Sequence, residues 1–395
     1  MEIKTKENIY EPAEDSYLIQ GVIDKLDLKD KLVLEIGTGS GILAITAAAK
    51  GARVTAVDIN LKALALAKSN SKLNNTQIDF IHSDMFDNIK GSYDYIFCNS
   101  PYLPEDAHEI DDAMSTAITG GKEGYEWCVE FLKQAQSHLN PKGKIYLLFS
   151  TLSKPKKILA AAEKSLYTTK KITEESLFFE KILVYEFFRS PILNFLYSLN
   201  IKKISYVDRG RRGVVYHGFY DGVSVAIKMH KEASKATHAL ANEAKWLKAL
   251  NKLGIGPKFI VFKDNAVIRE FVDGERINNY LTQATEKQAR EALNEIFRQC
   301  RVLDKNGIEK QEMKNPYKHI LVGKEITMID FERCRERESP SNITQLVQWV
   351  GSSLLTKILS EKNIKYDIKE LRDLVKIYKY DMTEKNYKKI ITFLS

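Results

Sequence analysis

Two segments of the chain, each an apolar run that ends in a turn, constrain its fold more than any other feature. Leu34–Gly41 reads LEIGTGSG, and Phe97–Tyr102 reads FCNSPY. The first predicts a strand, a glycine-rich turn and a helix, and glycine lets backbone approach a ligand without a Cβ clash. The second predicts a strand that ends in a proline-stiffened turn. Because the carboxyl ends of parallel strands meet at one edge of a sheet, we expect both turns beside one ligand.

Strands and helices alternate regularly through the first half of the chain. Apolar runs predict strands at Leu32–Ile36, Arg53–Asp58, Ile78–His82, Tyr93–Cys98, Lys144–Phe149 and Leu177–Phe188. Helices are expected between them at Ile42–Lys50, Ala63–Leu73, Glu123–Leu139 and Pro155–Lys164. This alternation predicts the α/β class, with a doubly wound, mostly parallel, Rossmann-like sheet.

A second pattern follows the apolar stretch Ile192–Leu199. Strands are predicted at Tyr206–Phe219, Val223–Met229, Lys258–Phe262 and Ala266–Phe271, with a long helix at Lys235–Leu253. Beyond Gly274 the pattern is mainly helical, with short β segments at Ile320–Val322 and Ile326–Ile329. The change predicts two domains, residues 1–190 and residues 200–395, of which the second is a two-lobed α+β domain.

The formal net charge of +8 is unevenly distributed along the 395 residues. Residues 1–190 carry 23 Lys and Arg against 27 Asp and Glu, whereas residues 191–395 carry 37 against 25. Affinity for duplex DNA comes largely from phosphate neutralisation, which the acidic first half does not favour. The basic second half fits an acidic partner such as RNA or a ribosome, or it is a solvated lysine-rich face.

Two further features concern the compartment. No apolar run approaches the roughly 18 residues of a membrane span, and the first residues lack the apolar stretch of a signal peptide. The four cysteines show no C-x-x-C spacing. We therefore expect a cytoplasmic protein with no membrane partner and no disulfide framework.

Three acidic residues stand near the carboxyl ends of predicted strands. Glu35 comes just before the glycine turn at Gly37 and Gly39, and Asp58 and Asp84 end or follow the next two strands. Asp58, about 20 residues further on, is placed to accept hydrogen bonds from ribose hydroxyls. Asp84 is placed to accept from an adenine amine or, alternatively, to cap a helix. The glycine pattern alone does not separate dinucleotide enzymes from methyltransferases or from a tight turn without ligand. Glu35, however, suits a cationic amino group better than a pyrophosphate, which favours S-adenosylmethionine.

The turn at Asn99–Tyr102 carries groups that suit methyl transfer to a planar nitrogen. Such a target needs an acceptor for each N–H, so that its lone pair faces the methyl group. The Asn99 side-chain oxygen and the Ser100 backbone carbonyl supply two acceptors, Pro101 stiffens the turn, and Tyr102 packs on the planar substrate. Orientation then replaces a strong base. An ordinary Asn/Ser/Pro turn is the alternative.

Together with Ile9–Leu18 and Gly120–Gly124, these segments resemble the HemK2/Mtq2 family over about residues 7–188. The resemblance implies methylation of a protein glutamine amide, typically in the Gly-Gly-Gln tip of the class I translation release factor. It also implies a small zinc-ribbon activator, Trm112. The family's cofactor contacts correspond here to Ser16, Glu35, Gly37, Asp58, Asp84, Met85 and Asn99. The chain departs from the family's N-P-P-Y pattern by having Ser100 in place of the first proline.

A nucleic-acid substrate is the alternative, because the same loop accepts the amino nitrogen of adenine or cytosine. The acidic charge of the first half and the Tyr10–Leu18 segment favour protein.

The second half resembles compact archaeal protein kinases of the RIO and Bud32 kind over residues 203–335. The resemblance aligns Gly210 and Gly213 with the glycine-rich loop, Lys228 with the phosphate-binding lysine and Glu243 with its helix partner. Asp330, in Asp-Phe-Glu, stands where kinases keep a metal-binding aspartate. The resemblance therefore implies ATP with Mg²⁺ as ligands.

The catalytic segment of kinases is altered in this chain. Glu312 takes the place of the catalytic aspartate as base, with Asn315 or His319 near the second metal position, but neither has the family's spacing. Three interpretations stay open: an active kinase or ATPase, an ATP-binding pseudokinase, and a structural module. A scaffold whose basic half docks the methylase on an RNA-rich target is a further alternative.

Overall fold

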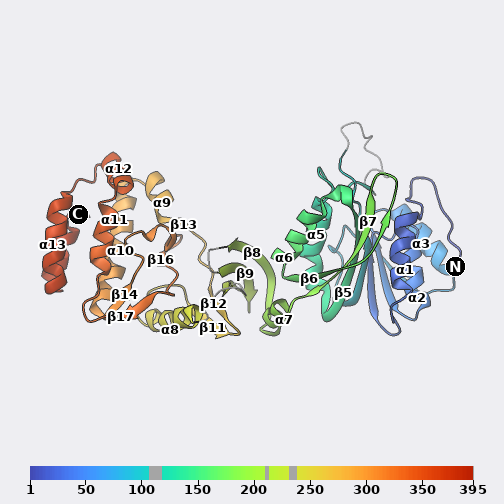
Figure 1. The fold of residues 1–395 in the computed structure, drawn as a ribbon, viewed down its shortest axis with the longest axis horizontal. Coiled ribbons are helices and arrows are strands. Elements are labelled where there is room, and N and C mark those ends of the chain that lie inside the picture. Colours follow the sequence, from blue (N-terminus) through green and yellow to red (C-terminus); the bar gives the residue numbers. More distant parts are fainter. Residues whose placement is uncertain (106–117, 210–212, 231–237, 395) are drawn as a thin grey trace. The chain divides into compact units, whose positions relative to one another are not determined.

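The computed structural model describes residues 1–105, 118–209, 213–230 and 238–394 (Figure 1). The chain divides into two compact units, Met1–Ser205 and Tyr206–Ser395. Each unit is described by itself.

The first unit is built on a mixed sheet that has seven strands among the described residues. Its order is β3-β2-β1-β4-β5-β7-β6. Neighbours from β3 to β5 are parallel, and β7 runs antiparallel to both β5 and β6. The predicted mostly parallel, Rossmann-like sheet is confirmed. The strands are β1 Leu32–Ile36, β2 Arg53–Asp58, β3 Ile78–His82, β4 Tyr93–Asn99, β5 Leu139–Ser150, β6 Tyr167–Ser176 and β7 Lys181–Arg189.

Helices cover both faces of this sheet, with α1, α2 and α3 on one side and α5 and α6 on the other (Figure 1). Successive side chains of β5 therefore enter two different cores: Leu147 packs towards α5 and α6, and Leu148 towards α1 and α2. Burial on both faces explains the continuous apolar runs of the central strands. The helices are α1 Glu14–Ile23, α2 Ile42–Ala49, α3 Leu61–Leu73, α5 Glu126–Ala135, α6 Pro155–Lys164 and α7 Pro191–Ser198, with short 3-10 turns at Gln136–His138 and Thr151–Ser153.

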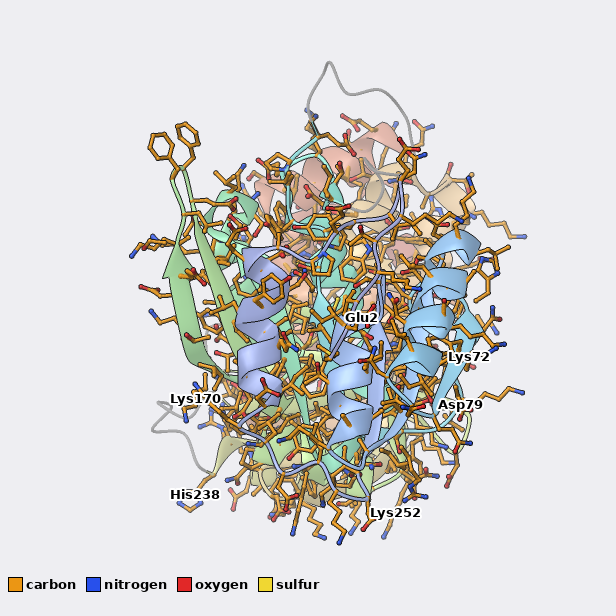
Figure 2. The ribbon with its side chains drawn as sticks, turned by 90° about the vertical axis from the view of Figure 1, so that its right-hand side faces the viewer. Glu2, Lys72, Asp79, Lys170, His238 and Lys252 are labelled. Atoms are coloured by element: carbon orange, nitrogen blue, oxygen red, sulfur yellow. The ribbon has the colours of Figure 1, made fainter. Side chains whose placement is uncertain are left out.

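The outer hairpin differs from the prediction. The strand expected at Leu177–Phe188 begins only at Lys181, and the edge strand β6, which carries the labelled Lys170 in Figure 2, was not predicted. Its sequence, YTTKKITEES, is polar, and most of its side chains are not buried. Charged residues are a common protection for an edge strand. They also remove the apolar signal by which a strand is recognised.

A second sheet has the order β11-β12-β10-β9-β8, and its strand β8 spans the boundary between the two units. Its neighbours from β11 to β9 are antiparallel, and α8 packs on β10, β11 and β12. The single strand predicted at Tyr206–Phe219 is wrong, because β8 and β9 are separate strands. The helix predicted from Lys235 is described from Ala239, since residues 231–237 lie outside the described part. The elements are β8 Ile201–Arg209, β9 Gly213–Tyr220, β10 Val223–His230, α8 Ala239–Asn251, β11 Phe259–Lys263 and β12 Ala266–Glu270.

The rest of the second unit is mainly helical, as predicted, around a core to which α10 contributes Leu293, Ile296 and Phe297. Its helices are α9 Ile277–Gln283, α10 Glu286–Lys305, α11 Asn342–Val350, α12 Ser353–Glu361, α13 Ile368–Tyr380 and α14 Glu384–Ile391. Its short strands are β13 Glu275–Arg276, β14 Ile308–Lys310, β15 Ile320–Val322, β16 Ile326–Met328 and β17 Cys334–Glu336, with 3-10 turns at Pro316–Lys318 and Thr392–Leu394.

Two predictions of absence can be compared with the described residues. None of their helices combines the length and the apolar character needed to cross a membrane. All four cysteines are buried and unpaired.

Candidate functional site

The carboxyl ends of β1, β2 and β4 border one cavity of about 770 Å³. The site residues predicted in the first half come from distant parts of the sequence, and the structure brings them together around this cavity. They are Ser16, Glu35, Gly37, Gly39, Asp58, Asp84, Met85, Asn99, Ser100, Pro101 and Tyr102.

The glycine turn forms one wall of the cavity. Gly37 and Gly39 have φ of +75° and +52°, a conformation that other residues rarely adopt. A Cβ at either position would project into open space, which leaves room for a ligand to lie on the backbone. Gly41 contributes to packing instead. A Cβ there would come within 3.0 Å of the Cβ of Ala67, so its small size lets α2 pack against α3.

Asp58 is held at the end of β2 by the turns on either side of it. Its Oδ2 accepts from the backbone N–H of Gly39 at 2.9 Å, and its Oδ1 accepts from that of Asn60 at 2.8 Å. Burial raises the pKa of Asp58, although these backbone hydrogen bonds oppose the shift. The carboxyl group is thus fixed in orientation beside the glycine turn, where a polar ligand gains an acceptor.

Glu35 is a buried carboxyl group at the end of β1. Its Oε2 accepts from the Thr38 hydroxyl at 2.6 Å and from the Ala44 N–H at 3.0 Å. Burial raises the pKa of Glu35 to about 8 in spite of these two hydrogen bonds. A cationic group placed beside Glu35 would favour its ionised form.

Asn99 ends β4 and borders the cavity. Its Nδ2 donates to the Ser16 hydroxyl at 3.4 Å, while its Oδ1 is buried and has no hydrogen-bond partner among the described residues. An unpaired buried acceptor costs about 1–3 kcal/mol, so such atoms are rare. An N–H donor from a ligand would satisfy this oxygen.

Ser100 is anchored where the family pattern has proline. Its hydroxyl donates to the Leu148 carbonyl of the neighbouring strand at 2.6 Å and accepts from the Cys128 thiol at 3.3 Å. The hydroxyl therefore ties the loop to β5, which compensates for the missing proline ring.

The following loop is braced by the glycines of Gly120–Gly124. The Tyr102 N–H donates to the Ile118 carbonyl at 3.0 Å. A Cβ on Gly120 would lie 2.6 Å from the Pro101 carbonyl oxygen, and one on Gly124 would lie 2.6 Å from that of Tyr102. The absence of side chains at Gly120 and Gly124 therefore lets this segment pack directly against the backbone of Pro101 and Tyr102.

Sequence reasoning missed two cavity-lining contributions. The Tyr10 hydroxyl donates to Asp15 Oδ2 at 2.8 Å, and Asp15 Oδ1 accepts from the Ser16 N–H at 2.5 Å. The hydrogen bonds of Asp15 thus position Ser16. The acidic and aromatic residues of Ile9–Leu18 were the sequence signal that could have identified this contribution. Trp127 also lines the cavity, but it lies in a predicted helix where nothing marked it.

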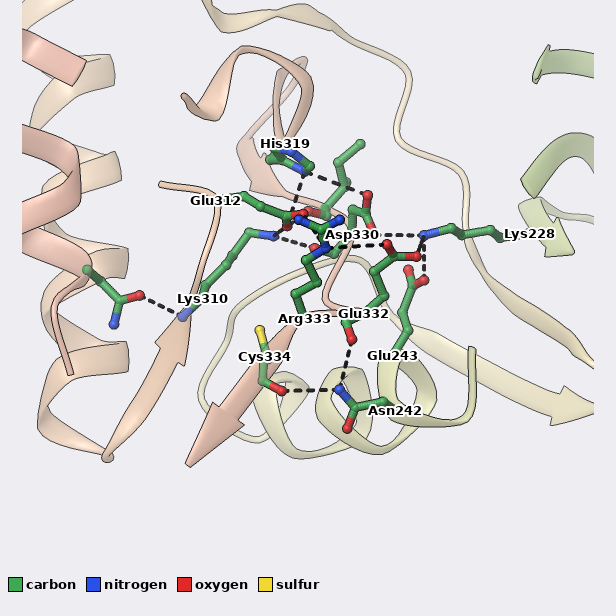
Figure 3. Close-up of polar contacts among 12 residues, drawn as sticks. Lys228, Asn242, Glu243, Lys310, Glu312, His319, Asp330, Glu332, Arg333 and Cys334 are labelled. Carbon is green, nitrogen blue, oxygen red and sulfur yellow. Dashed lines mark hydrogen bonds and ion pairs between the residues drawn. The ribbon is translucent and has the colours of Figure 1, made fainter. Parts of the chain in front are cut away.

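A second cluster forms around Lys228 in the second unit (Figure 3). Lys228 of β10 donates to Glu243 of α8 at 2.6 Å and to Asp330 at 2.7 Å, and Glu332 lies 3.6 Å away. The three carboxylates lie close enough together to hold a metal ion. In this structure the ammonium group of Lys228 is their common counter-charge.

The electrostatics of this cluster favour the ionised forms. Burial alone would lower the pKa of Lys228, but Glu243 and Asp330 raise it. Burial likewise opposes ionisation of Asp330, yet Lys228 and Lys310 outweigh it and lower the pKa of Asp330 to about 2.

Glu312 and His319 lie on the other side of Asp330. His319 Nδ1 is 3.8 Å from Glu312 Oε2 and 3.7 Å from Asp330 Oδ2, while Asn315 is exposed. His319 is therefore the one of the two predicted candidates that approaches Asp330. Burial lowers the pKa of His319 to about 4, so the imidazole is neutral near pH 7.

Lys310 is a fully buried lysine that sequence reasoning missed. Its Nζ donates to the carbonyls of Ile329 and Asp330 and lies 3.8 Å from Glu312 Oε2. It thus fixes the segment that carries Asp330.

Of the two glycines predicted in the phosphate loop, the structure describes one. Gly213 opens β9, where a Cβ would lie 2.6 Å from the Met229 carbonyl oxygen. Gly210 lies outside the described residues.

Comparison with known proteins assigns a family to the first unit. The model of the family described as "Methyltransferase small domain" matches residues 15–178. A provisionally named protein N5-glutamine methyltransferase of Methanocaldococcus jannaschii is 42% identical over 161 residues, which are 40% of this chain and 81% of that protein. The release factor glutamine methyltransferase of Lactococcus lactis is 33% identical over 156 residues, or 37% of this chain and 58% of that protein.

Solved structures of methyltransferases also match. The E. cuniculi Mtq2–Trm112 complex, described as responsible for methylating the eRF1 termination factor, contains a chain 26% identical to this one. The match covers 46% of this chain and 99% of that chain, with a TM-score of 0.39. A Pyrococcus furiosus methyltransferase is 24% identical, with coverage of 47% and 88% and a TM-score of 0.39.

Proposed function

The chain belongs, through residues 15–178, to the methyltransferase small domain family, and from this premise we propose that it methylates a protein glutamine. The methyl acceptor is the side-chain amide nitrogen, and the methyl donor is S-adenosylmethionine. A class I translation release factor with a Gly-Gly-Gln tip is the proposed substrate.

The observation that carries this proposal is the unpaired Oδ1 of Asn99. Asn99 lines the cavity at the end of β4, together with Ser100 and Tyr102. A primary amide brings two N–H donors on one planar nitrogen. Asn99 Oδ1 and the Ser100 carbonyl accept one each, which satisfies the buried oxygen and fixes the orientation of the nitrogen.

The cavity also fits the methyl donor. Gly37 and Gly39 leave their backbone open, Asp58 offers an acceptor for ribose hydroxyls, and Glu35 offers a carboxyl group for an amino cation. Bound S-adenosylmethionine supplies an electrophilic methyl group. The residues of the chain would hold the amide nitrogen in line with that group, and the proton that the nitrogen loses as it gains the methyl passes to solvent. No residue needs to be a strong base.

Protein is favoured over nucleic acid as substrate by the acidic first half and by the names of the relatives. The test is incubation with labelled S-adenosylmethionine and either release factor or total RNA and DNA. We expect label in the release factor. Label found only in nucleic acid would replace the glutamine with an adenine or cytosine amino group. The proposed requirement for a Trm112-like activator is tested in the same assay by adding that protein.

A second function is proposed for residues 200–395, because Lys228, Glu243 and Asp330 form the ion-pair cluster that a kinase-like nucleotide site needs. ATP with Mg²⁺ would be held by Lys228 through its phosphates and by Asp330 through the metal. Glu312, half-buried and with a pKa raised by burial, is the proposed base.

Thermal unfolding with and without ATP and Mg²⁺ tests this second function. Wild-type protein should be stabilised by the nucleotide, and Lys228→Ala and Asp330→Ala should lose that stabilisation. Undiminished stabilisation of both variants would show that ATP is not held by this cluster. Loss of phosphate transfer in Glu312→Gln, with ATP binding retained, would support Glu312 as base.

A further inference from the structure

Two adjacent phenylalanines stand exposed at the tip of the β6–β7 hairpin. Phe178 and Phe179 are 91% and 85% exposed, and their ring centroids lie 4.5 Å apart at an interplanar angle of 89°. Single exposed apolar side chains are normal in folded proteins. Two adjacent aromatic rings on one turn form a contiguous apolar patch, and such patches usually mark an interaction site.

The tip is held in place by its base. The Leu177 N–H donates to the Glu180 carbonyl at 2.8 Å, which closes the turn, and the Leu177 side chain packs against the core that also contains residues of α1. The Lys181 N–H donates to the Thr151 hydroxyl at 3.0 Å, and the Ser150 hydroxyl donates to the Glu180 carboxylate. The rings are therefore presented on a braced turn, so little conformational entropy is lost when they bind.

The tip lies at the same edge of the sheet as the methyl-transfer cavity. Ser150, to which the hairpin is tied, is the last residue of β5, and Leu148, two residues earlier, lies opposite Asn99 of β4. Figure 2 shows the hairpin that carries Lys170 beside the helices of this unit. A large molecule with one side chain in the cavity would thus meet the tip with its surface.

We propose that Phe178 and Phe179 form a docking tip that binds an apolar depression on the folded protein carrying the target glutamine. This inference rests on the proposed function, since it names how the same site selects its substrate. This contact lies outside the cavity. The cavity recognises the glutamine amide, and the tip recognises the surface of the substrate protein near that glutamine. Aromatic side chains, phenylalanine included, are enriched at the cores of protein–protein interfaces.

Two features favour protein over a nucleic acid at this tip. The rings are perpendicular, so they do not form a parallel platform on which successive bases stack. Residues 170–181 carry three lysines and three glutamates, and Glu174 forms ion pairs with Lys171 and Lys181, so the hairpin offers no net positive charge to a phosphate backbone. An apolar protein surface meets neither obstacle.

The test compares wild type with the double variant Phe178→Ser, Phe179→Ser. Its matched control is Tyr380→Ser, which removes an aromatic ring that is 93% exposed in the second unit. Initial rates of methylation are measured over a range of folded release factor concentrations, and binding of S-adenosylhomocysteine is measured by calorimetry. We expect KM for the release factor to rise about 10- to 100-fold in the double variant. Its kcat, its cofactor affinity and all constants of Tyr380→Ser should stay unchanged.

The outcomes separate this inference from the proposed function. An unchanged KM in the double variant, with wild type active, would overturn the docking tip alone. Loss of cofactor binding by the double variant would also overturn it, because the tip would then be structural. If RNA inhibited the wild type but not the double variant, the tip would be a binding site for nucleic acid and not for protein. Failure of wild type to methylate the release factor would overturn the proposed substrate and the docking partner with it.

Discussion

The hydroxyl of Ser100 donates to the backbone carbonyl of Leu148 at 2.6 Å, and this hydrogen bond joins the loop at Asn99–Tyr102 to β5. The loop therefore keeps a fixed position although it lacks the first proline of the N-P-P-Y pattern. Removal of the hydroxyl would leave only the longer bond from the Ser100 backbone N–H to the same carbonyl, at 3.4 Å, and would not alter the backbone acceptors of the loop.

Ser100→Ala is expected to lower kcat by about tenfold and the free energy of unfolding by about 1–2 kcal/mol, because a buried hydrogen bond is lost. Cofactor affinity should not change. The matched control is Ser198→Ala, which removes an exposed hydroxyl-to-carbonyl bond to Phe195. Ser100→Pro, which restores the ring, should retain more activity than Ser100→Ala. Equal kcat in Ser100→Ala and wild type would show that the bond does not support catalysis.

Asp58→Ala should weaken binding of S-adenosylmethionine by about 10- to 100-fold, because the variant loses the acceptor for ribose and the anchor of the Gly39 N–H. Isothermal titration calorimetry measures the effect. Asp79→Ala, a substitution at an exposed position on the neighbouring strand β3, serves as control and should bind normally. Equal binding by wild type and Asp58→Ala would remove Asp58 from the cofactor site.

The pKa of Glu35, about 8, predicts that cofactor affinity depends on pH. Below that pH the free protein holds a proton on Glu35, and an amino cation must displace it. Affinity should therefore rise by up to about tenfold per pH unit between about pH 6 and 8 and level off above. In Glu35→Gln the pH dependence should disappear. A wild-type affinity that is flat across this range would contradict the role of Glu35.

The raised pKa of Glu35 also makes the free energy of unfolding of the cofactor-free protein depend on pH. The folded-state pKa of Glu35 lies above its ordinary value of 4.5, so the folded state binds more protons between those two values. The free energy of unfolding of the first unit should fall as pH rises through this window. Urea titrations of wild type and Glu35→Gln at pH 5 and pH 8 measure the difference, and the variant should lose less stability.

Lys228→Met is expected to lower the free energy of unfolding of the second unit by about 3–5 kcal/mol, because the buried Glu243 carboxylate loses its ion-pair partner. Adding Glu243→Gln should recover part of the loss. The control is Lys245→Met, whose ion pair with Glu336 is exposed and should contribute at most about 1 kcal/mol. Equal effects of the two lysine substitutions would contradict the account of the cluster.

The central strands and their turns could be predicted from the sequence, and the reason lies in their burial. Strands β1, β2 and β4 are largely covered on both faces, so they are rich in apolar residues, and polar residues or glycine stand at their carboxyl ends. Because those ends share one edge, Glu35, Asp58 and Asn99 were expected together, and the structure brings them together. What each of these side chains binds stays a prediction.

The remaining features could not be predicted because they depend on tertiary contacts. The edge strand β6 faces solvent and carries no apolar alternation. Buried Lys310 looks like any surface lysine until Ile329 and Asp330 offer their carbonyls. The Ser100 hydroxyl gains its partner only from the register between β4 and β5.

The most direct test of the central claim is to map the methyl group on the release factor by tandem mass spectrometry after reaction with wild type and with Asn99→Ala. We predict one methyl group, on the side-chain nitrogen of the Gly-Gly-Gln glutamine. Asn99→Ala should lose at least about 100-fold in kcat while it still binds the cofactor. A methyl group on any other atom, or undiminished transfer by Asn99→Ala, would contradict the account.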